Sequence, residues 1–146
     1  MEQEKEEYTY RHSMPIQLRF NDVDRYGHVN NNAYFSFYDL GKVDYMTRVL
    51  GLYKGKTDVV PVVANINADF YLPVFYGDDI VVETCVPHLG EKSFTLHQRA
   101  VNRGTNLVVC QCTTIMVCFS LKAQKSVEIP APFREAIMRF EAGEEN

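Results

Sequence analysis

Residues 21–35, NDVDRYGHVNNNAYF, decide how this chain of 146 residues folds. They follow a short alternating apolar segment and precede a proline-free apolar segment of helical length. The stretch holds two aspartates, a glycine, a histidine and three consecutive asparagines, all of them residues that favour turns and helix caps. The sequence therefore predicts a polar loop that ends at the start of a helix.

A long helix is predicted from about residue 31 to residue 50, because this segment has neither a proline nor a turn cluster. Arg48 in the last turn and Gly51 at the position of a left-handed C′ residue mark its end. At about 100° per residue, its apolar side chains point in nearly every direction. We therefore expect this helix to be enclosed on most sides.

Alternation of apolar and polar residues predicts strands on both sides of this helix in the sequence. In residues 16–20, Ile16, Leu18 and Phe20 are expected to face inward. In residues 62–72, the even-numbered side chains from Val62 to Leu72 are expected to share one face, with polar residues on the other. Further strands are expected at 79–86, 93–101 and 107–119, and a last helix near Pro132.

This order of elements predicts an α+β fold in which one antiparallel sheet curls around the long helix. The short turns between the last four strands imply that each strand lies beside the next. Residues 1–12 are rich in glutamate and are predicted to be a flexible N-terminal segment. Residues 13–142 are predicted to form a single domain.

Composition excludes several classes of protein. No apolar run reaches the roughly 18 to 20 residues that a bilayer requires, so no membrane span is expected. The charged start, MEQEKEEYTY, differs from an apolar signal peptide and favours a cytoplasmic protein. A net charge of −4 and the lack of a basic stripe argue against nucleic acid as a partner.

The four cysteines all lie in apolar, strand-like segments and are expected to be buried free thiols. A metal site is the alternative, because Cys110 and Cys112 could share a strand face near His97 or Cys118. The CxxC spacing of common zinc sites is absent, so no metal is expected.

Two interpretations of the polar loop follow from the chemistry of helix ends, whose first backbone N–H groups lack internal partners and carry partial positive charge. In the first, one of Asn30, Asn31 and Asn32 caps the helix and the aspartates only form turns. A single helix cap needs only one of these residues, however, so the first interpretation leaves other polar residues of the loop without a role. In the second, an exposed N–H is directed at a substrate carbonyl and a neighbouring carboxylate attacks or activates water, which suits acyl transfer.

A family resemblance favours the second interpretation. Residues 19–31, RFNDVDRYGHVNN, resemble the R(F/Y)xDxDxxGHVNN signature of hotdog-fold acyl-CoA thioesterases, the 4-hydroxybenzoyl-CoA thioesterase-like group. Residues 73–78, PVFYGD, resemble the PxxxGD turn of that family, and residues 90–94, GEKSF, resemble its G-x-(K/S)-S-F segment. The resemblance covers about residues 15–140. It implies a hotdog fold, a five-stranded antiparallel sheet wrapped around one long helix, here with a short C-terminal helix.

The resemblance also implies roles for residues of the loop. Asp24 matches the catalytic carboxylate, as nucleophile or as general base. The backbone N–H of Asn31 matches the donor that polarises the thioester carbonyl, and His28 is expected to hold the loop or contact the thioester. Gly27, Asn30 and Tyr34 are expected beside the substrate, and Gly27 to supply a positive φ or a close approach. An apolar wall for the acyl chain could come from Tyr34, Phe35, Tyr38, Ile66 and Phe70.

The implied substrate is an acyl-CoA or acyl-carrier-protein thioester, hydrolysed without a metal or other cofactor. The implied assembly is a homodimer or homotetramer with the site between subunits. Coenzyme A phosphates would need local cations, for which the candidates are Arg25, Lys54, Lys56, Lys92, Arg99 and Arg103. Because one fold hosts several functions, a hydroxyacyl-thioester dehydratase or hydratase and a non-catalytic acyl-thioester binder remain alternatives.

Overall fold

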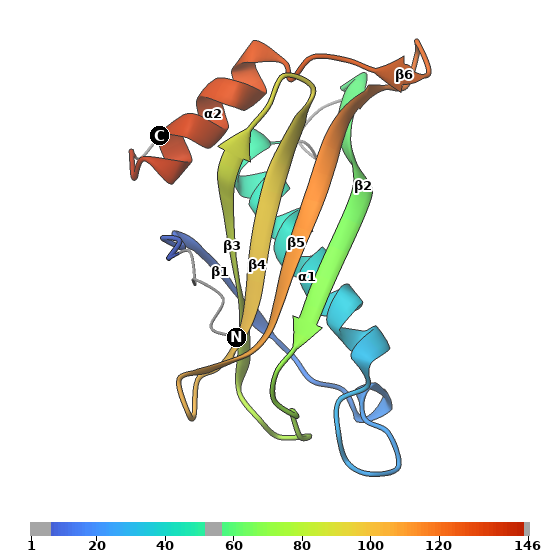
Figure 1. The fold of residues 1–146 in the computed structure, drawn as a ribbon, viewed down its shortest axis with the longest axis vertical. Coiled ribbons are helices and arrows are strands. Elements are labelled where there is room, and N and C mark those ends of the chain that lie inside the picture. Colours follow the sequence, from blue (N-terminus) through green and yellow to red (C-terminus); the bar gives the residue numbers. More distant parts are fainter. Residues whose placement is uncertain (1–6, 52–56, 145–146) are drawn as a thin grey trace, which may run out of the picture.

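The computed structural model describes residues 7–51 and 57–144, which form a curved antiparallel sheet with a long helix across one face (Figure 1). The predicted α+β architecture is confirmed. The elements in chain order are β1 (His12–Ile16), η1 (Phe20–Asp22), α1 (Asn31–Tyr45), η2 (Met46–Leu50), β2 (Val59–Phe70), β3 (Ile80–Leu89), β4 (Ser93–Asn102), β5 (Leu107–Ser120), β6 (Lys125–Ser126) and α2 (Ala131–Glu141).

The sheet order is β1-β3-β4-β5-β2, and all of these neighbours are antiparallel. In the described part of the chain the sheet has six strands rather than five, because the two-residue β6 pairs with the end of β5. The prediction that β2 and β3 form a hairpin is wrong. β2 pairs with β5 at one edge, so the chain after β2 must cross the end of the sheet to reach β3.

Helix α1 begins where the sequence predicts, and only together with the π-helical turn η2 does it reach the predicted end at Leu50. Asn30 is its N-cap, the helix continues through the π-helical turn η2, and Gly51 has a φ of 65° in the left-handed region. Gly41 faces the sheet, where a Cβ atom would lie 2.9 Å from Val82 Cγ1. The missing side chain therefore lets the helix approach the sheet closely.

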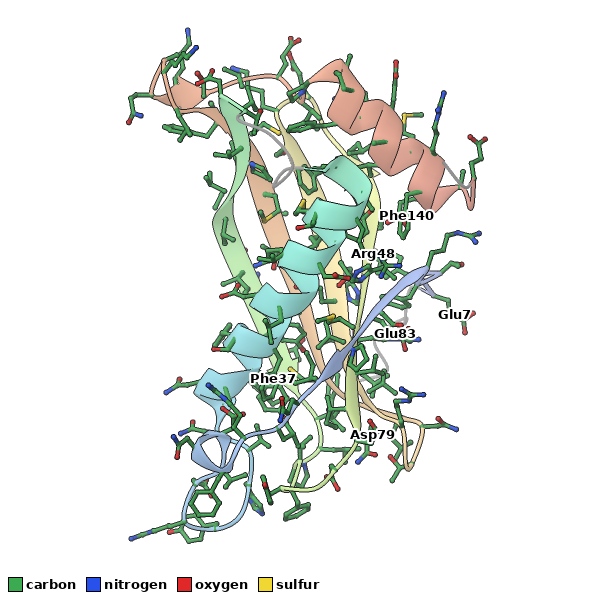
Figure 2. All side chains as sticks on the ribbon, turned by 180° about the vertical axis from the view of Figure 1, so that it is seen from behind. Glu7, Phe37, Arg48, Asp79, Glu83 and Phe140 are labelled. Atoms are coloured by element: carbon green, nitrogen blue, oxygen red, sulfur yellow. The ribbon has the colours of Figure 1, made fainter. Side chains whose placement is uncertain are left out.

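The expectation that α1 is enclosed on most sides is wrong for the single chain. Tyr34, Phe37, Tyr38 and Tyr45 are buried against the sheet, as predicted for a core helix. The opposite side of the helix carries Phe35, Leu40 and Val43 at 39%, 51% and 46% exposure. The sheet covers only one side of α1 (Figure 2), and the three apolar side chains on the other side are open to solvent.

The first strand lies earlier in the sequence than predicted, at β1, so that only Ile16 of the three expected inward residues is buried. Phe20 is 77% exposed. The reason is local, because Arg19 donates its backbone N–H to Asp22 Oδ2 at 2.8 Å and the chain turns into η1. The alternating pattern of residues 16–20 thus extends past the end of the strand.

Because of a β-bulge at Ala64, the faces predicted for Val62 and Val63 in β2 are wrong. Val63 pairs with the buried Met116, whereas Asn65 pairs with Ile115 on the opposite face of β5. Directly paired residues share a face of the sheet. Val63 therefore lies on the helix side with Ile66, Ala68 and Phe70, and Val62 lies on the outer side.

Segments near both chain ends pack onto this framework. His12 is buried and its Nε2 lies 2.6 Å from Asp44 Oδ2 on α1. Tyr45 donates its hydroxyl to Glu141 Oε1 of α2 at 2.6 Å, and burial raises the pKa of Glu141. Of the segment predicted to be flexible, residues 1–6 lie outside the described residues, and His12 already belongs to β1.

The alternative metal ligands do not come together. Cys110 and Cys112 face the core, whereas His97 pairs with Thr113 on the outer face and meets Tyr10 at 2.7 Å. The cysteines are free and buried, and burial raises the pKa of Cys110 to about 11.

The described residues form two α-helices, α1 and α2. Neither helix is long and apolar enough to cross a membrane.

Candidate active site

The loop before α1 is a small hairpin. Val23 and Val29 form an antiparallel bridge, the Asp24 N–H donates to the His28 carbonyl at 2.8 Å, and the Gly27 N–H donates to the Asp24 carbonyl at 3.0 Å. Gly27 has a φ of 80°, as a three-residue hairpin loop that ends in a left-handed residue requires. The predicted positive φ at Gly27 is confirmed.

This hairpin orients the carboxylate of Asp24. Its Oδ1 accepts the backbone N–H of Tyr26 at 2.8 Å and that of His28 at 3.3 Å. No hydrogen bond reaches its Oδ2 from residues 7–51 or 57–144, and the residue is exposed. One oxygen therefore holds the loop while the other remains available for chemistry.

Asp22, the other aspartate of the motif, braces the loop from inside. Only 4% of it is exposed, and its carboxylate accepts the Arg19 backbone N–H at 2.8 Å and the Arg19 guanidinium at 3.2 Å. Its carbonyl accepts the Asn30 N–H at 2.7 Å. All of these contacts are internal, so Asp22 serves the conformation of the loop.

The three asparagines at the helix start have different environments. Asn30 caps the helix by accepting the Asn32 N–H on its side-chain oxygen at 3.3 Å. Asn31 is the first helical residue, and no acceptor for its N–H exists among the described residues. An unpaired amide at this end, where the helix dipole is positive, is a ready donor for an oxygen of a ligand.

A pocket of about 390 Å³, here called the amide pocket, brings these groups together. It is within the size range of small-molecule sites. Of the predicted site residues, Asp24, His28, Asn30, Asn31 and Tyr34 line it, and Gly27 does not. The rest of its lining is Val29, Phe70, Tyr71, Leu72 and Pro73.

Tyr34 is the buried back wall of the amide pocket. It is 3% exposed and packs edge-on against Phe70 with ring centroids 5.3 Å apart. Burial raises its pKa to about 12, so its hydroxyl stays protonated at neutral pH. Of the other wall residues expected from the sequence, Phe70 lines this pocket, and Phe35, Tyr38 and Ile66 do not.

The crossover from β2 to β3 supplies lining residues that the sequence did not indicate, namely Tyr71, Leu72 and Pro73. The Val29 N–H donates to the Val74 carbonyl at 2.7 Å, and the His28 ring lies edge-on to Phe75 with centroids 4.9 Å apart. The PxxxGD motif in this crossover was a possible signal. Its turn is formed as expected, since Asp78 Oδ2 accepts the Phe75 N–H at 2.9 Å.

A second pocket, here called the aromatic pocket, also borders the hairpin and has a volume of about 530 Å³. Phe20 and Tyr76 form its rim with their rings edge-on at a centroid distance of 6.3 Å. Phe20 was predicted to face the core, so sequence reasoning missed this pocket. Its lining comprises Phe20, Val23, Asp24, Arg25, Gly27 and Tyr76.

The candidate cations for coenzyme A phosphates have varied surroundings. Arg25 lies in the site loop, with its guanidinium 3.0 Å from the Tyr26 hydroxyl. Arg99 pairs with Glu83 at 3.1 Å and Arg103 with Asp79 at 3.9 Å, both away from the two pockets. Lys92 is exposed, and Lys54 and Lys56 lie outside the described residues.

Comparisons with known proteins match most of this chain. The sequence model of the thioesterase-like superfamily matches residues 18–137. The long-chain acyl-CoA thioesterase FadM of Escherichia coli strain K12 is 27% identical over 123 residues, which span 84% of this chain and 93% of FadM.

Solved structures confirm the predicted hotdog fold. The PA5185 protein from Pseudomonas aeruginosa strain PAO1 has a TM-score of 0.82 at 26% identity, and the match covers 93% of this chain and 95% of that one. A thioesterase from Thermus thermophilus, solved in complex with coenzyme A and zinc, has a TM-score of 0.77. Its 23% identity, with 88% of this chain and 98% of that one covered, shows the fold alone.

The capping geometry makes a prediction about the three asparagines. Replacing Asn30 with alanine removes the acceptor for the Asn32 N–H and should lower the free energy of unfolding by about 1 kcal/mol. Asn30→Ser should retain most of the stability. Asn32→Ala, the matched control, should change it by less than about 0.5 kcal/mol. Urea denaturation of the three variants tests this, and equal losses for Asn30→Ala and Asn32→Ala would contradict the assignment of the cap.

Proposed function

The chain belongs to the thioesterase-like superfamily, and from this premise we propose that it hydrolyses acyl thioesters to a free carboxylic acid and a thiol. One observation carries the proposal, namely that an oriented carboxylate, Asp24, and an unpaired amide, that of Asn31, line the same pocket. The similarity to FadM supports an acyl-CoA as substrate, with an acyl carrier protein as the alternative carrier. The four free cysteines fit a reducing, cytoplasmic setting.

In the proposed mechanism, the thioester carbonyl oxygen accepts the Asn31 N–H. Attack at the carbonyl carbon then moves negative charge onto that oxygen, where the hydrogen bond is strongest. One such donor contributes about 3 kcal/mol in the transition state, whereas an exposed charge near a helix dipole gains about 0.3 to 1 kcal/mol. The directed hydrogen bond should therefore exceed the effect of the helix dipole.

Asp24 supplies the attacking group in one of two ways. As a general base, Oδ2 removes a proton from water, the resulting hydroxide adds to the carbonyl carbon, and collapse expels the thiolate, which takes up the proton. As a nucleophile, Oδ2 adds to the carbonyl carbon and expels the thiolate, leaving an acyl anhydride that water hydrolyses. Single-turnover reaction in ¹⁸O-water separates the two, because the nucleophilic route can leave the label on Asp24.

His28 has a positioning role in this proposal. Its backbone N–H and carbonyl both bond to Asp24, at 3.3 Å from Oδ1 and at 2.8 Å from the Asp24 N–H. His28 lines the amide pocket, and its ring lies edge-on to Phe75, where it can contact the thioester. Asn30 caps the helix whose first amide is the donor, and Tyr34 closes the back of the pocket.

We further propose that the protein acts as a homodimer, or as a homotetramer built from that dimer. β2 is an edge strand of 12 residues with exposed apolar side chains, including Val63 at 48% and Ile66 at 36%. Such an edge is a template for pairing with another strand. The open side of α1 adds Phe35, Leu40 and Val43 to the apolar surface. Since Phe70 at the end of β2 lines the amide pocket, a partner paired there would lie next to the site.

Thiol release from a panel of acyl-CoAs, followed with a thiol reagent at micromolar enzyme, tests the activity. Asp24→Asn is nearly isosteric but is neither base nor anionic nucleophile, so kcat/KM should fall by about a hundredfold or more. Asp79→Asn, an exposed carboxylate outside both pockets, is the control and should retain activity. Binding without thiol release would favour a non-catalytic binder, and a change in enoyl-CoA absorbance would favour a hydratase.

The role of the Asn31 amide can be tested by removing the N–H itself. Proline fits the first position of a helix, and Asn30, with φ −66° and ψ 138°, has the extended conformation that a following proline requires. Asn31→Pro should therefore fold and should lower kcat/KM by about 10² to 10³. Asn31→Ala keeps the amide and should lose far less. Equal activity of these two variants would exclude this amide as the donor.

The assembly can be tested by placing charges on the edge of β2. Val63→Asp combined with Ile66→Asp should leave the protomer folded, since both side chains are exposed, but should raise the dissociation constant of the dimer by about a hundredfold or more. Leu121→Asp, at an exposed apolar position outside β2 and α1, is the control. Sedimentation velocity measures the outcome. A wild-type chain that is active and monomeric at micromolar concentration would contradict the proposal.

A further inference from the structure

The amide pocket and the aromatic pocket meet at one side chain. Asp24 is the single described residue that lines both of them. The amide pocket contains the Asn31 donor and the crossover residues Tyr71 to Pro73, and the aromatic pocket contains Phe20 and Tyr76. The carboxylate therefore stands at the junction of two separate spaces, of about 390 Å³ and about 530 Å³.

The reacting carbonyl carbon of a thioester likewise connects two separate groups. Two arms leave the carbonyl carbon, the acyl group on one side and the sulfur with its carrier on the other. If the carbonyl lies between Asp24 and the Asn31 amide, as the proposed function requires, each arm needs its own space. Two pockets that share Asp24 supply these two spaces.

The chemistry of the aromatic pocket suits the acyl arm. Phe20 and Tyr76 are 77% and 58% exposed, so an apolar group packed against the two rings would remove aromatic surface from water. Val23 adds an apolar wall. Gly27 carries no side chain to fill the space, and nothing lies within 4 Å of where its Cβ would be.

Arg25, the one cation among the residues that line the aromatic pocket, already contacts Tyr26. The Arg25 guanidinium donates to the Tyr26 hydroxyl at 3.0 Å and lies 5.1 Å from the centroid of the Tyr26 ring. Tyr26 does not line this pocket, so the charged end of Arg25 contacts a residue outside the pocket lining. The lining of the amide pocket holds no lysine or arginine, and that of the aromatic pocket holds only Arg25, so neither offers two cations to a diphosphate. The assignment of the two arms therefore rests on the exposed rings of Phe20 and Tyr76 rather than on charge.

We infer that the acyl group of the substrate lies in the aromatic pocket against the rings of Phe20 and Tyr76, and that the carrier arm leaves through the amide pocket along Tyr71 to Pro73. This inference rests on the proposed function. The volume of about 530 Å³ is several times that of a cavity of about 150 Å³ that binds benzene. The pocket therefore selects aryl and medium- to long-chain acyl groups over acetyl, and Phe20 and Tyr76 are specificity-determining residues.

The test is a kcat/KM profile across acetyl-, hexanoyl-, decanoyl-, palmitoyl- and benzoyl-CoA for the full chain. Phe20→Ala and Tyr76→Ala should each lower kcat/KM for decanoyl- and benzoyl-CoA about tenfold or more, and for acetyl-CoA by less than about threefold. Phe20→Leu should recover part of the loss. Leu107→Ala, which removes a comparably exposed apolar side chain outside both pockets, should leave the profile unchanged.

Each other outcome overturns the inference in a distinguishable way. An equal loss for every substrate, acetyl-CoA included, would assign the aromatic pocket to the carrier arm. An unchanged profile in both alanine variants would mean that neither arm lies there, while the proposed hydrolysis stands. If the wild type releases no thiol from any member of the panel, the proposed function itself fails, and the assignment of the acyl arm fails with it.

Discussion

The site depends on which backbone N–H groups at the start of α1 find a hydrogen-bond acceptor and which do not. A helix leaves its first N–H groups without internal acceptors. Here the loop satisfies those on either side of Asn31, because the Asn30 N–H bonds to the Asp22 carbonyl and the Asn32 N–H bonds to the Asn30 side chain. The amide of Asn31 has no acceptor among the described residues, and Asp24, whose Oδ1 the same loop holds, lines the pocket where that amide lies.

The loop alone would not make a pocket. The opposite wall comes from the crossover between β2 and β3, which passes the helix start because these strands are not neighbours. Val74 in that crossover is 1% exposed and accepts the Val29 N–H, so the crossover is anchored in the core and to the loop at once. The polar hairpin and the aromatic residues that flank it are therefore held at a set spacing.

β2 links the site to the surface that we assign to assembly. One end of this strand supplies Phe70 to the amide pocket, and its free edge exposes Val63 and Ile66. Because a strand is stiff along its length, an edge partner that orders β2 also orders the wall of the pocket. Catalysis and assembly would then depend on the same element, while the aromatic pocket, built from the hairpin and Tyr76, belongs to the protomer.

The sequence by itself determined the parts of the molecule that depend on near neighbours in the chain. The cap at the helix start, the left-handed Gly51 and the positive φ at Gly27 follow from hydrogen bonds and steric preferences within a few residues. The family resemblance pointed to Asp24, His28 and Asn31, which line one pocket. Their chemical roles remain predictions.

Tertiary structure alone decided the rest, because strand pairing joins residues that are distant in sequence. The pairing of β2 with β5 sends the crossover past the site and introduces the bulge at Ala64, which reverses the faces expected for Val62 and Val63. Phe20 looked like a core residue from its alternation with Leu18, but the turn at Asp22 placed it outside, opposite Tyr76. Local patterns specify which segments form; their pairing in space specifies which surfaces meet.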